Sequence, residues 1–228
     1  NDLSSRLDWK YDELYSLIHQ LQPQCMIGNN HHQTPFAGED FQMFERDLPG
    51  ENTSGLSYQK ASDALPLETC ETMNNSWGFN LGDKSYKSAK TVIRYLVGAA
   101  GRNANLLLNI GPMPNGDIQQ EFKDTLQAVG NWMSKYGHTI YGTRGNIMPP
   151  QKWGVVTVKE KNYYLHLLNT DSVSTIELPF ADKKLRAVSL NDGSKIDLKR
   201  VQNKWQLTIP EAARQEKIDY IIEVGVVK

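Results

Sequence analysis

The chain has 228 residues, a formal net charge of −1 and 22% charged residues of both signs. Because this balance leaves no basic surplus, it argues against nucleic acid and against anionic lipid as partners. The longest apolar runs, such as 106–110, are far too short to span a bilayer, and the first residues lack the pattern of a signal peptide. We therefore expect a protein without a membrane span, with a core large enough for one large or two small domains.

Residues up to 145 alternate between helical and extended patterns. Apolar side chains at helical spacing predict the helices, and short apolar runs predict the strands. The elements expected in chain order are a helix over 11–21, a strand over 25–28, a long loop over 29–66, a strand over 67–73, a helix over 89–100, a strand over 105–110 and a helix over 122–136.

This alternation is typical of an α/β fold with a parallel sheet. The near-continuous apolar run at 105–110 suits a strand that is covered on both faces. Long loops follow the strands, at the end where (β/α)8 barrels carry their chemistry. Too few strands are predicted to close a barrel, so we expect this segment to be incomplete.

The pattern changes at 146–150. From Trp153 onward, short strands recur at regular spacing, and Asp192-Gly193 is typical of a hairpin turn. The expected strands cover 153–158, 162–169, 174–179, 185–190, 195–201, 204–209 and 218–224. We therefore predict two domains, an α/β domain over 1–145 and an antiparallel β-sandwich over 146–228.

Residues that could carry chemistry gather in the long loop. It holds Asn30, His31, Glu39 and Glu45, and Glu68 stands in the next strand. Carboxylates that follow barrel strands suit acid–base catalysis, because proton transfer needs a group held on a rigid rim. A solvated loop would carry the same residue types, so the pattern alone leaves both interpretations open.

Two further features are ambiguous when they are read from the residues alone. The adjacent pair His31-His32 lacks the i, i+4 spacing of zincin ligands, so polar substrate contacts or loop packing are favoured over a metal site. Trp77 could be a core residue or a platform for a sugar ring.

Four motifs in order resemble those of glycoside hydrolase family 29, the α-L-fucosidases. Residues 103–112, with Asn115-Gly116 after them, resemble the signature GGN-x-LLNIGP-x-x-DG, although Arg102 and Asn103 replace a glycine and Asn115 replaces Asp. The other three are 65–70 with 76–78, similar to WE-x-C…S[WF]GY; 38–40 before 47–50, similar to the acid/base loop; and 136–143, similar to the end of the last barrel helix.

The resemblance implies a retaining exo-α-L-fucosidase that needs no cofactor or metal and acts on terminal fucose of oligosaccharides or glycoconjugates. The chain would be the C-terminal half of a (β/α)8 TIM barrel followed by the β-sandwich. Retention requires two carboxyl groups about 5–5.5 Å apart. The family's nucleophile is an Asp in a Trp-x-Asp motif that this sequence lacks. We expect it upstream of Asn1, in the N-terminal half of the same polypeptide.

The resemblance also implies roles for individual residues. Glu39 is the preferred acid/base, because its offset from the Asp47–Gly50 segment matches the family pattern. Glu68 is the rival, and Glu45 is a weaker third candidate, read as a loop charge facing Arg46. Trp77 would contact the fucose methyl group and ring. Asn30 and His31 fall where the family commonly has Asn-Asp-Arg, and would contact fucose hydroxyl groups.

Two other functions fit the same residues. One is a noncatalytic barrel that binds fucose or glycans, and the other is an inverting hydrolase, whose carboxyl groups would lie about 6.5–9.5 Å apart. Kinship implies a periplasmic or secreted protein, or a lysosomal one in a eukaryote. The sequons at 52–54 and 74–76 are interpreted as chance matches.

Overall fold

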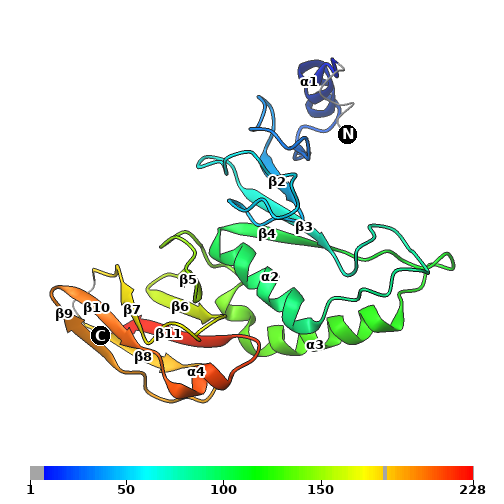
Figure 1. Cartoon of the computed structure of the whole chain (residues 1–228). Coiled ribbons are helices and arrows are strands. Elements are labelled where there is room, and N and C mark those ends of the chain that lie inside the picture. The colour runs from blue at the N-terminus through cyan, green and yellow to red at the C-terminus, as the bar shows by residue number, and fades with distance from the viewer. Residues whose placement is uncertain (1–7, 182–183, 228) are drawn as a thin grey trace. The chain divides into compact units, whose positions relative to one another are not determined.

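A computed structural model describes residues 8–181 and 184–227 (Figure 1). The chain divides into two compact units. The first takes the residues up to 72 together with 104–109, and the second takes 73–103 together with the residues from 110 onward. Within the described ranges, no helix combines the length and apolar character needed to cross a bilayer.

Among its described residues, the first unit contains one helix and a parallel sheet. Helix α1 (Tyr11–Leu21) precedes four strands, whose order in the sheet is the order in the chain. They are β1 (Gly28–Asn29), β2 (Phe41–Glu45), β3 (Leu67–Thr72) and β4 (Ala104–Asn109). Each neighbouring pair is parallel. All four strands therefore end at one edge of the sheet, called the carboxyl edge below.

Strand β2 lies inside the segment that the sequence predicts as a loop over 29–66, so that prediction is wrong at 41–45. The strand alternates between partly and fully buried residues, and Phe44 is fully buried. One inward position is polar. Gln42 is buried because its amide donates to the Lys60 carbonyl oxygen (3.0 Å) and accepts from Ser62 N (2.7 Å). Since the pattern of apolar residues counts Gln as exposed, it hides this strand.

The described part of the second unit contains the two long helices α2 (Ala89–Gly101) and α3 (Gln120–Tyr136), two short helices and a β-sandwich. One sheet has the order β5-β6-β11-β8 and the other β7-β10-β9, and all neighbouring strands are antiparallel. The strands are β5 (Gly154–Lys159), β6 (Asn162–Leu167), β7 (Thr175–Leu178), β8 (Leu185–Ser189), β9 (Leu198–Val201), β10 (Lys204–Thr208) and β11 (Tyr220–Val226). All seven predicted strands are present. A short helix, α4 (Glu211–Gln215), was not predicted.

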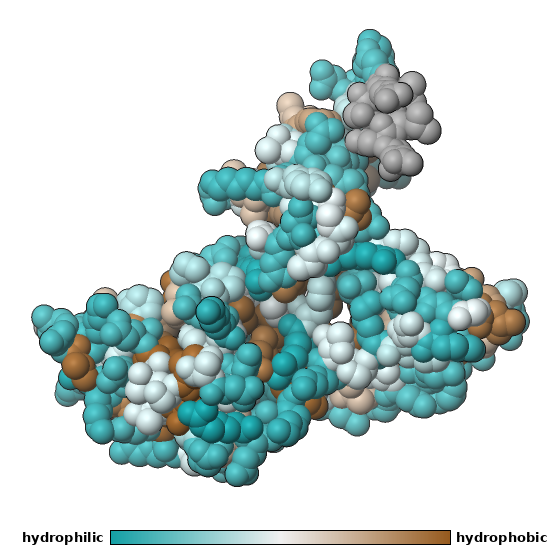
Figure 2. Space-filling view, viewed as in Figure 1, coloured by the Kyte–Doolittle hydropathy of each residue, from teal (hydrophilic) through white to brown (hydrophobic). Residues whose placement is uncertain are grey.

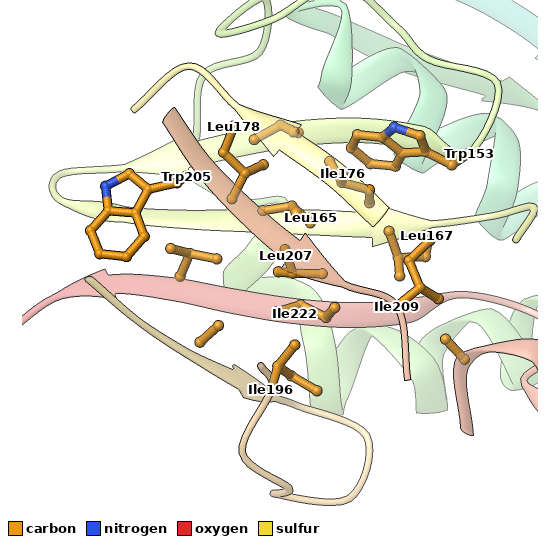
Figure 3. Close-up of a cluster of buried hydrophobic side chains, with 14 of the residues drawn as sticks. Trp153, Leu165, Leu167, Ile176, Leu178, Ile196, Trp205, Leu207, Ile209 and Ile222 are labelled. Atoms are coloured by element: carbon orange, nitrogen blue, oxygen red, sulfur yellow. The ribbon is translucent and has the colours of Figure 1, made fainter. Parts of the chain in front are cut away.

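Apolar side chains from the two sheets meet in one core (Figure 3). Leu165 and Ile222 of the first sheet and Leu207 of the second are fully buried there. Alternation puts these residues on the inner faces. This shared apolar core explains why the two antiparallel sheets pack together as the sandwich that the sequence predicts.

The other face of the first sheet is covered by helices. Helices α2 (Ala89–Gly101) and α3 (Gln120–Tyr136) lie side by side (Figure 1), and the short helix η2 (Gly137–Thr139) follows α3. Ile93, Val97, Trp132 and Tyr136 pack in one cluster with residues of β5, β6 and β11. The helices and the sandwich thus share a core. The predicted domain boundary at 145/146 stays a prediction.

The surface seen in Figure 2 is mostly hydrophilic, with hydrophobic residues in small patches. Both cysteines are free; Cys70 is buried and Cys25 is partly buried.

Candidate active site

The carboxyl edge of the parallel sheet carries a row of polar side chains. Glu45 is the last residue of β2, and Asn30 follows β1. Asn30 Nδ2 donates to Glu45 Oε2 over 2.7 Å, and His32 Nε2 lies 3.8 Å from the same oxygen. The Glu45 side chain is 21% exposed, so it is held by neighbours and still reaches the surface. This is the edge where parallel sheets bind ligands.

The row continues along the next two strands. Thr72 ends β3 and Asn109 ends β4, and the two residues are paired in the register. Asn109 Nδ2 donates to Thr72 Oγ1 over 3.0 Å. Sequence reasoning missed both residues as candidates. The signal was available, since Asn109 closes the apolar run of β4 and Thr72 closes β3.

Glu39 is enclosed in the loop between β1 and β2. Its Oε1 accepts hydrogen bonds from the Tyr15 hydroxyl (2.8 Å) and lies 2.9 Å from His31 Nε2, and its Oε2 accepts from Phe36 N (3.0 Å). Only 1% of the Glu39 side chain is exposed. Burial, together with the nearby carboxylate of Glu39, raises the pKa of Tyr15 to about 12 despite a hydrogen bond from Asn29. Tyr15 is therefore a protonated donor at neutral pH.

The structure thus brings His31 to Glu39 and Asn30 to Glu45, as two neighbouring groups. The His31 ring also stacks on Phe36, with ring centroids 4.2 Å apart. A stacked, hydrogen-bonded imidazole has a fixed orientation. His31 therefore helps to hold Glu39 in place.

Glu68 lies near the other end of its strand. It is the second residue of β3 and is paired with Met43 of β2, whereas Glu45 is paired with Cys70. Side chains of paired residues point to the same face, so Glu68, Cys70 and Glu45 share one face of the sheet. Burial raises the pKa of Glu68. Burial, with the negative charges of Glu45 and Glu68, raises the pKa of the Cys70 thiol to about 11.

A cleft of about 790 Å³ opens beside His31 in the same unit. Its lining includes the start of α1 and the loop after β1, with the aromatic residues Trp9, Tyr11 and Phe36 and the carboxylates of Asp12 and Glu13. Aromatic faces with a few polar groups suit a sugar ring and its hydroxyl groups.

Trp77 belongs to the second compact unit, and the residue is 37% exposed. Asn74, just before it, is buried and its Oδ1 accepts from Ser76 N (3.2 Å). Within the described ranges, no three His, Cys, Asp or Glu side chains come together as metal ligands would.

Comparison with known proteins gives one family. The family model described as Alpha-L-fucosidase matches residues 2–138. Plasma alpha-L-fucosidase of Homo sapiens is 31% identical over 105 residues, which are 42% of this chain and 22% of that protein. Alpha-L-fucosidase of Dictyostelium discoideum is 28% identical over 167 residues, which are 68% of this chain and 36% of that protein. The chain therefore spans between a fifth and two fifths of these relatives.

Solved structures agree in fold. Alpha-L-fucosidase isoenzyme 1 from Paenibacillus thiaminolyticus is similar with a TM-score of 0.74 and 31% identity, over 96% of this chain and 54% of that protein. The Thermotoga maritima alpha-fucosidase crystallised with a mechanism-based inhibitor gives a TM-score of 0.68 at 21% identity, over 95% of this chain and 49% of that one.

Proposed function

The chain belongs to the alpha-L-fucosidase family, and we propose that it is part of a retaining exo-α-L-fucosidase. The enzyme would release terminal L-fucose from oligosaccharides or glycoconjugates by double displacement, without a cofactor. The family match over residues 2–138 carries this proposal. The polar carboxyl edge and the aromatic cleft beside it support it, because both suit a sugar substrate. We propose a periplasmic, secreted or lysosomal location for the same reason of kinship.

The fold suggests what completes the site. A sheet of four parallel strands cannot close into a (β/α)8 barrel, so we propose that this chain is the barrel's C-terminal half, followed by the sandwich. Leu14, Leu17 and Leu21 of α1 are exposed and three or four residues apart, as expected of a helix face that other elements cover. The N-terminal half of the same polypeptide would supply those elements and the nucleophilic Asp.

Three carboxylates are candidates for the acid/base. Glu39, the first choice from sequence, would have to leave three hydrogen bonds to reach a leaving group. Glu68 has the raised pKa that a general acid needs, but it lies near the amino end of β3. Glu45 stands at the carboxyl edge, where catalytic groups of barrels are found. Glu45 is therefore the candidate that the geometry supports best, and Glu39 and Glu68 stay in the proposal as its rivals.

Three variants of the intact polypeptide, Glu39→Gln, Glu45→Gln and Glu68→Gln, separate these candidates. Loss of the acid should lower hydrolysis of fucosides with poor leaving groups by about 10²–10⁴-fold, and should affect activated aryl fucosides far less. Glu121→Gln, on α3, is the matched control. If the selective loss falls on Glu39 or Glu68 and spares Glu45, our preference is wrong.

The reaction itself is tested by following the anomer of fucose that is released first. Retention predicts that α-L-fucose forms first and then mutarotates, which ¹H NMR resolves. Release of the β-anomer first would show inversion. Tight binding of fucose without any hydrolysis would favour the noncatalytic binding protein.

A further inference from the structure

Residues 75–79 are called the Trp77 segment below. On its N-terminal side, this segment is held by the carboxylate of Asp83. Asp83 Oδ2 accepts hydrogen bonds from Asn75 N (2.9 Å) and from the Ser76 hydroxyl (2.9 Å). Asp83 Oδ1 accepts from Ser85 N over 3.0 Å. The Ser85 amide and the Ser76 hydroxyl lower the pKa of Asp83, so the carboxylate stays charged at neutral pH. The residues just before Trp77 are therefore tied to one fixed acceptor.

On the C-terminal side, the segment lies directly on Gly111. A Cβ atom added to Gly111 would be 2.5 Å from the Gly78 carbonyl carbon and 2.7 Å from Phe79 N. Real Cβ atoms do not approach backbone this closely, and no side-chain rotation relieves the contact. Because Gly111 has no Cβ, the peptide that follows Trp77 can rest on it.

The requirement for glycine is specific to Gly111. A Cβ atom on Gly78, the other partner of the contact, would meet no atom within 4 Å. Pro112 follows Gly111 and disfavours helical backbone angles at the residue before it. Gly111 is also buried. The Gly78–Phe79 peptide therefore packs directly against the backbone at Gly111.

We propose that Gly111 and Asp83 are positioning residues for Trp77, which hold the indole where it contacts the sugar without contacting the sugar themselves. This inference rests on the proposed function and on the role that the family resemblance implies for Trp77, which is contact with fucose. A displacement of about 1 Å at such a contact can cost on the order of 10²-fold in activity. Gly111 and Asp83 should therefore control fucose affinity through the position of one side chain.

The test uses the intact polypeptide and two readouts. The first is the indole N–H resonance of Trp77, assigned by its disappearance in Trp77→Phe. The second is inhibition of aryl fucoside hydrolysis by free L-fucose. Gly111→Ala should shift the Trp77 resonance and raise the fucose inhibition constant at least tenfold. Gly130→Ala, in α3, adds a Cβ that meets no atom within 4 Å and should change neither readout.

Asp83→Asn provides a second variant should Gly111→Ala fail to fold, because it leaves the glycine contact intact. It should shift the same resonance and weaken fucose inhibition. Unchanged readouts in the folded variants would overturn the inference, and so would a shifted resonance with unchanged fucose inhibition. If the wild-type protein binds no fucose, the proposed function has failed. The resonance then decides separately whether Gly111 and Asp83 hold Trp77.

Discussion

His166 Nδ1 lies 2.7 Å from Asp219 Oδ2, and neither side chain is exposed to solvent. His166 is on β6, and Asp219 directly precedes β11. On the other side of the ring, Thr157 Oγ1 lies 3.4 Å from His166 Nε2 and donates to the Thr139 carbonyl oxygen over 2.7 Å. A series of polar contacts that runs from Asp219 through His166 and Thr157 therefore joins the first sheet of the sandwich to η2.

Removing one member of this pair should destabilise the sandwich strongly. Asp219→Ala leaves a buried imidazole without its partner, and we expect the free energy of unfolding to fall by about 3–5 kcal/mol. Urea unfolding measures this. Glu177→Ala removes the exposed pair with Lys204 and should cost about 1 kcal/mol or less. Equal losses in the two variants would contradict a structural role for the buried pair.

Asp47 should make stability depend on pH in the acid range. Burial alone would raise its pKa, but hydrogen bonds from Ser54 and Thr53 outweigh burial and lower the pKa from 3.8 to about 2. Because the folded-state pKa is depressed, the stabilisation is present above the unfolded pKa and is lost as pH falls from about 4 to 2.

The shift corresponds to about 2 kcal/mol, which Asp47→Asn should remove at pH 7. Unfolding by urea at several pH values measures the loss of stability at pH 7. It also shows whether stability still falls between about pH 4 and pH 2, the acid limb of the stability curve, which should be flatter in the variant. Asp63→Asn, at an exposed ion pair with Lys60, is the control and should leave the limb unchanged. A wild-type acid limb in Asp47→Asn would show that another carboxylate is responsible.

Ionisation of Glu68 should affect stability in the opposite direction to ionisation of Asp47. Because burial raises its pKa in the folded state, ionisation of Glu68 costs stability as pH rises through that pKa. We expect Glu68→Gln to raise the melting temperature at pH 7, with a gain that shrinks as pH falls. Thermal unfolding at pH 4 and pH 7 measures this. A gain that does not depend on pH would mean that the ionised carboxylate is not the cause.

Gly154 should not tolerate a side chain. It has φ +148°, and an added Cβ would lie 1.8 Å from the His166 carbonyl oxygen. We expect Gly154→Ala to lower the free energy of unfolding by roughly 3 kcal/mol, because backbone strain adds to overpacking. Gly130→Ala, inside α3 with free space around it, should instead stabilise by up to about 1 kcal/mol. Denaturant titration compares the two.

The fold was largely predictable because its signals are local. The helix predicted at 11–21 has these bounds, and the strands of the sandwich lie within a few residues of their predicted ranges. Strand β2 was hidden because Gln42 is buried with partners from 60 and 62, which no local pattern reveals. Long-range hydrogen bonds decide such positions.

One departure from the family motif has a physical explanation. Asn103 replaces a glycine of the signature, and its φ is +59°, in the left-handed region. Asparagine tolerates this region better than most residues, and its Oδ1 also accepts from Gly145 N over 3.2 Å. The substitution therefore keeps the turn between α2 and β4.

The sequence names candidate residues for the site but not how they are arranged, and their roles stay predictions. Sequence reasoning named Glu39, His31 and Asn30, and the structure brings the first two together and pairs the third with Glu45. It could not show that Tyr15, on α1, closes over Glu39. Which carboxylate can donate a proton to a substrate depends on such contacts between distant segments. The spacing of apolar residues along the sequence does not reveal these contacts.

The burial of Asn74 has a practical consequence for production of the protein. Asn74 as a whole is 2% exposed and its Oδ1 accepts from Ser76 N, so an oligosaccharide attached there before folding would have no space in the native structure. Secretory expression in yeast, whose transferase modifies nascent Asn-x-Ser segments, should yield a misfolded fraction that Asn74→Gln abolishes. Bacterial cytoplasm, which lacks that enzyme, should give a homogeneous product.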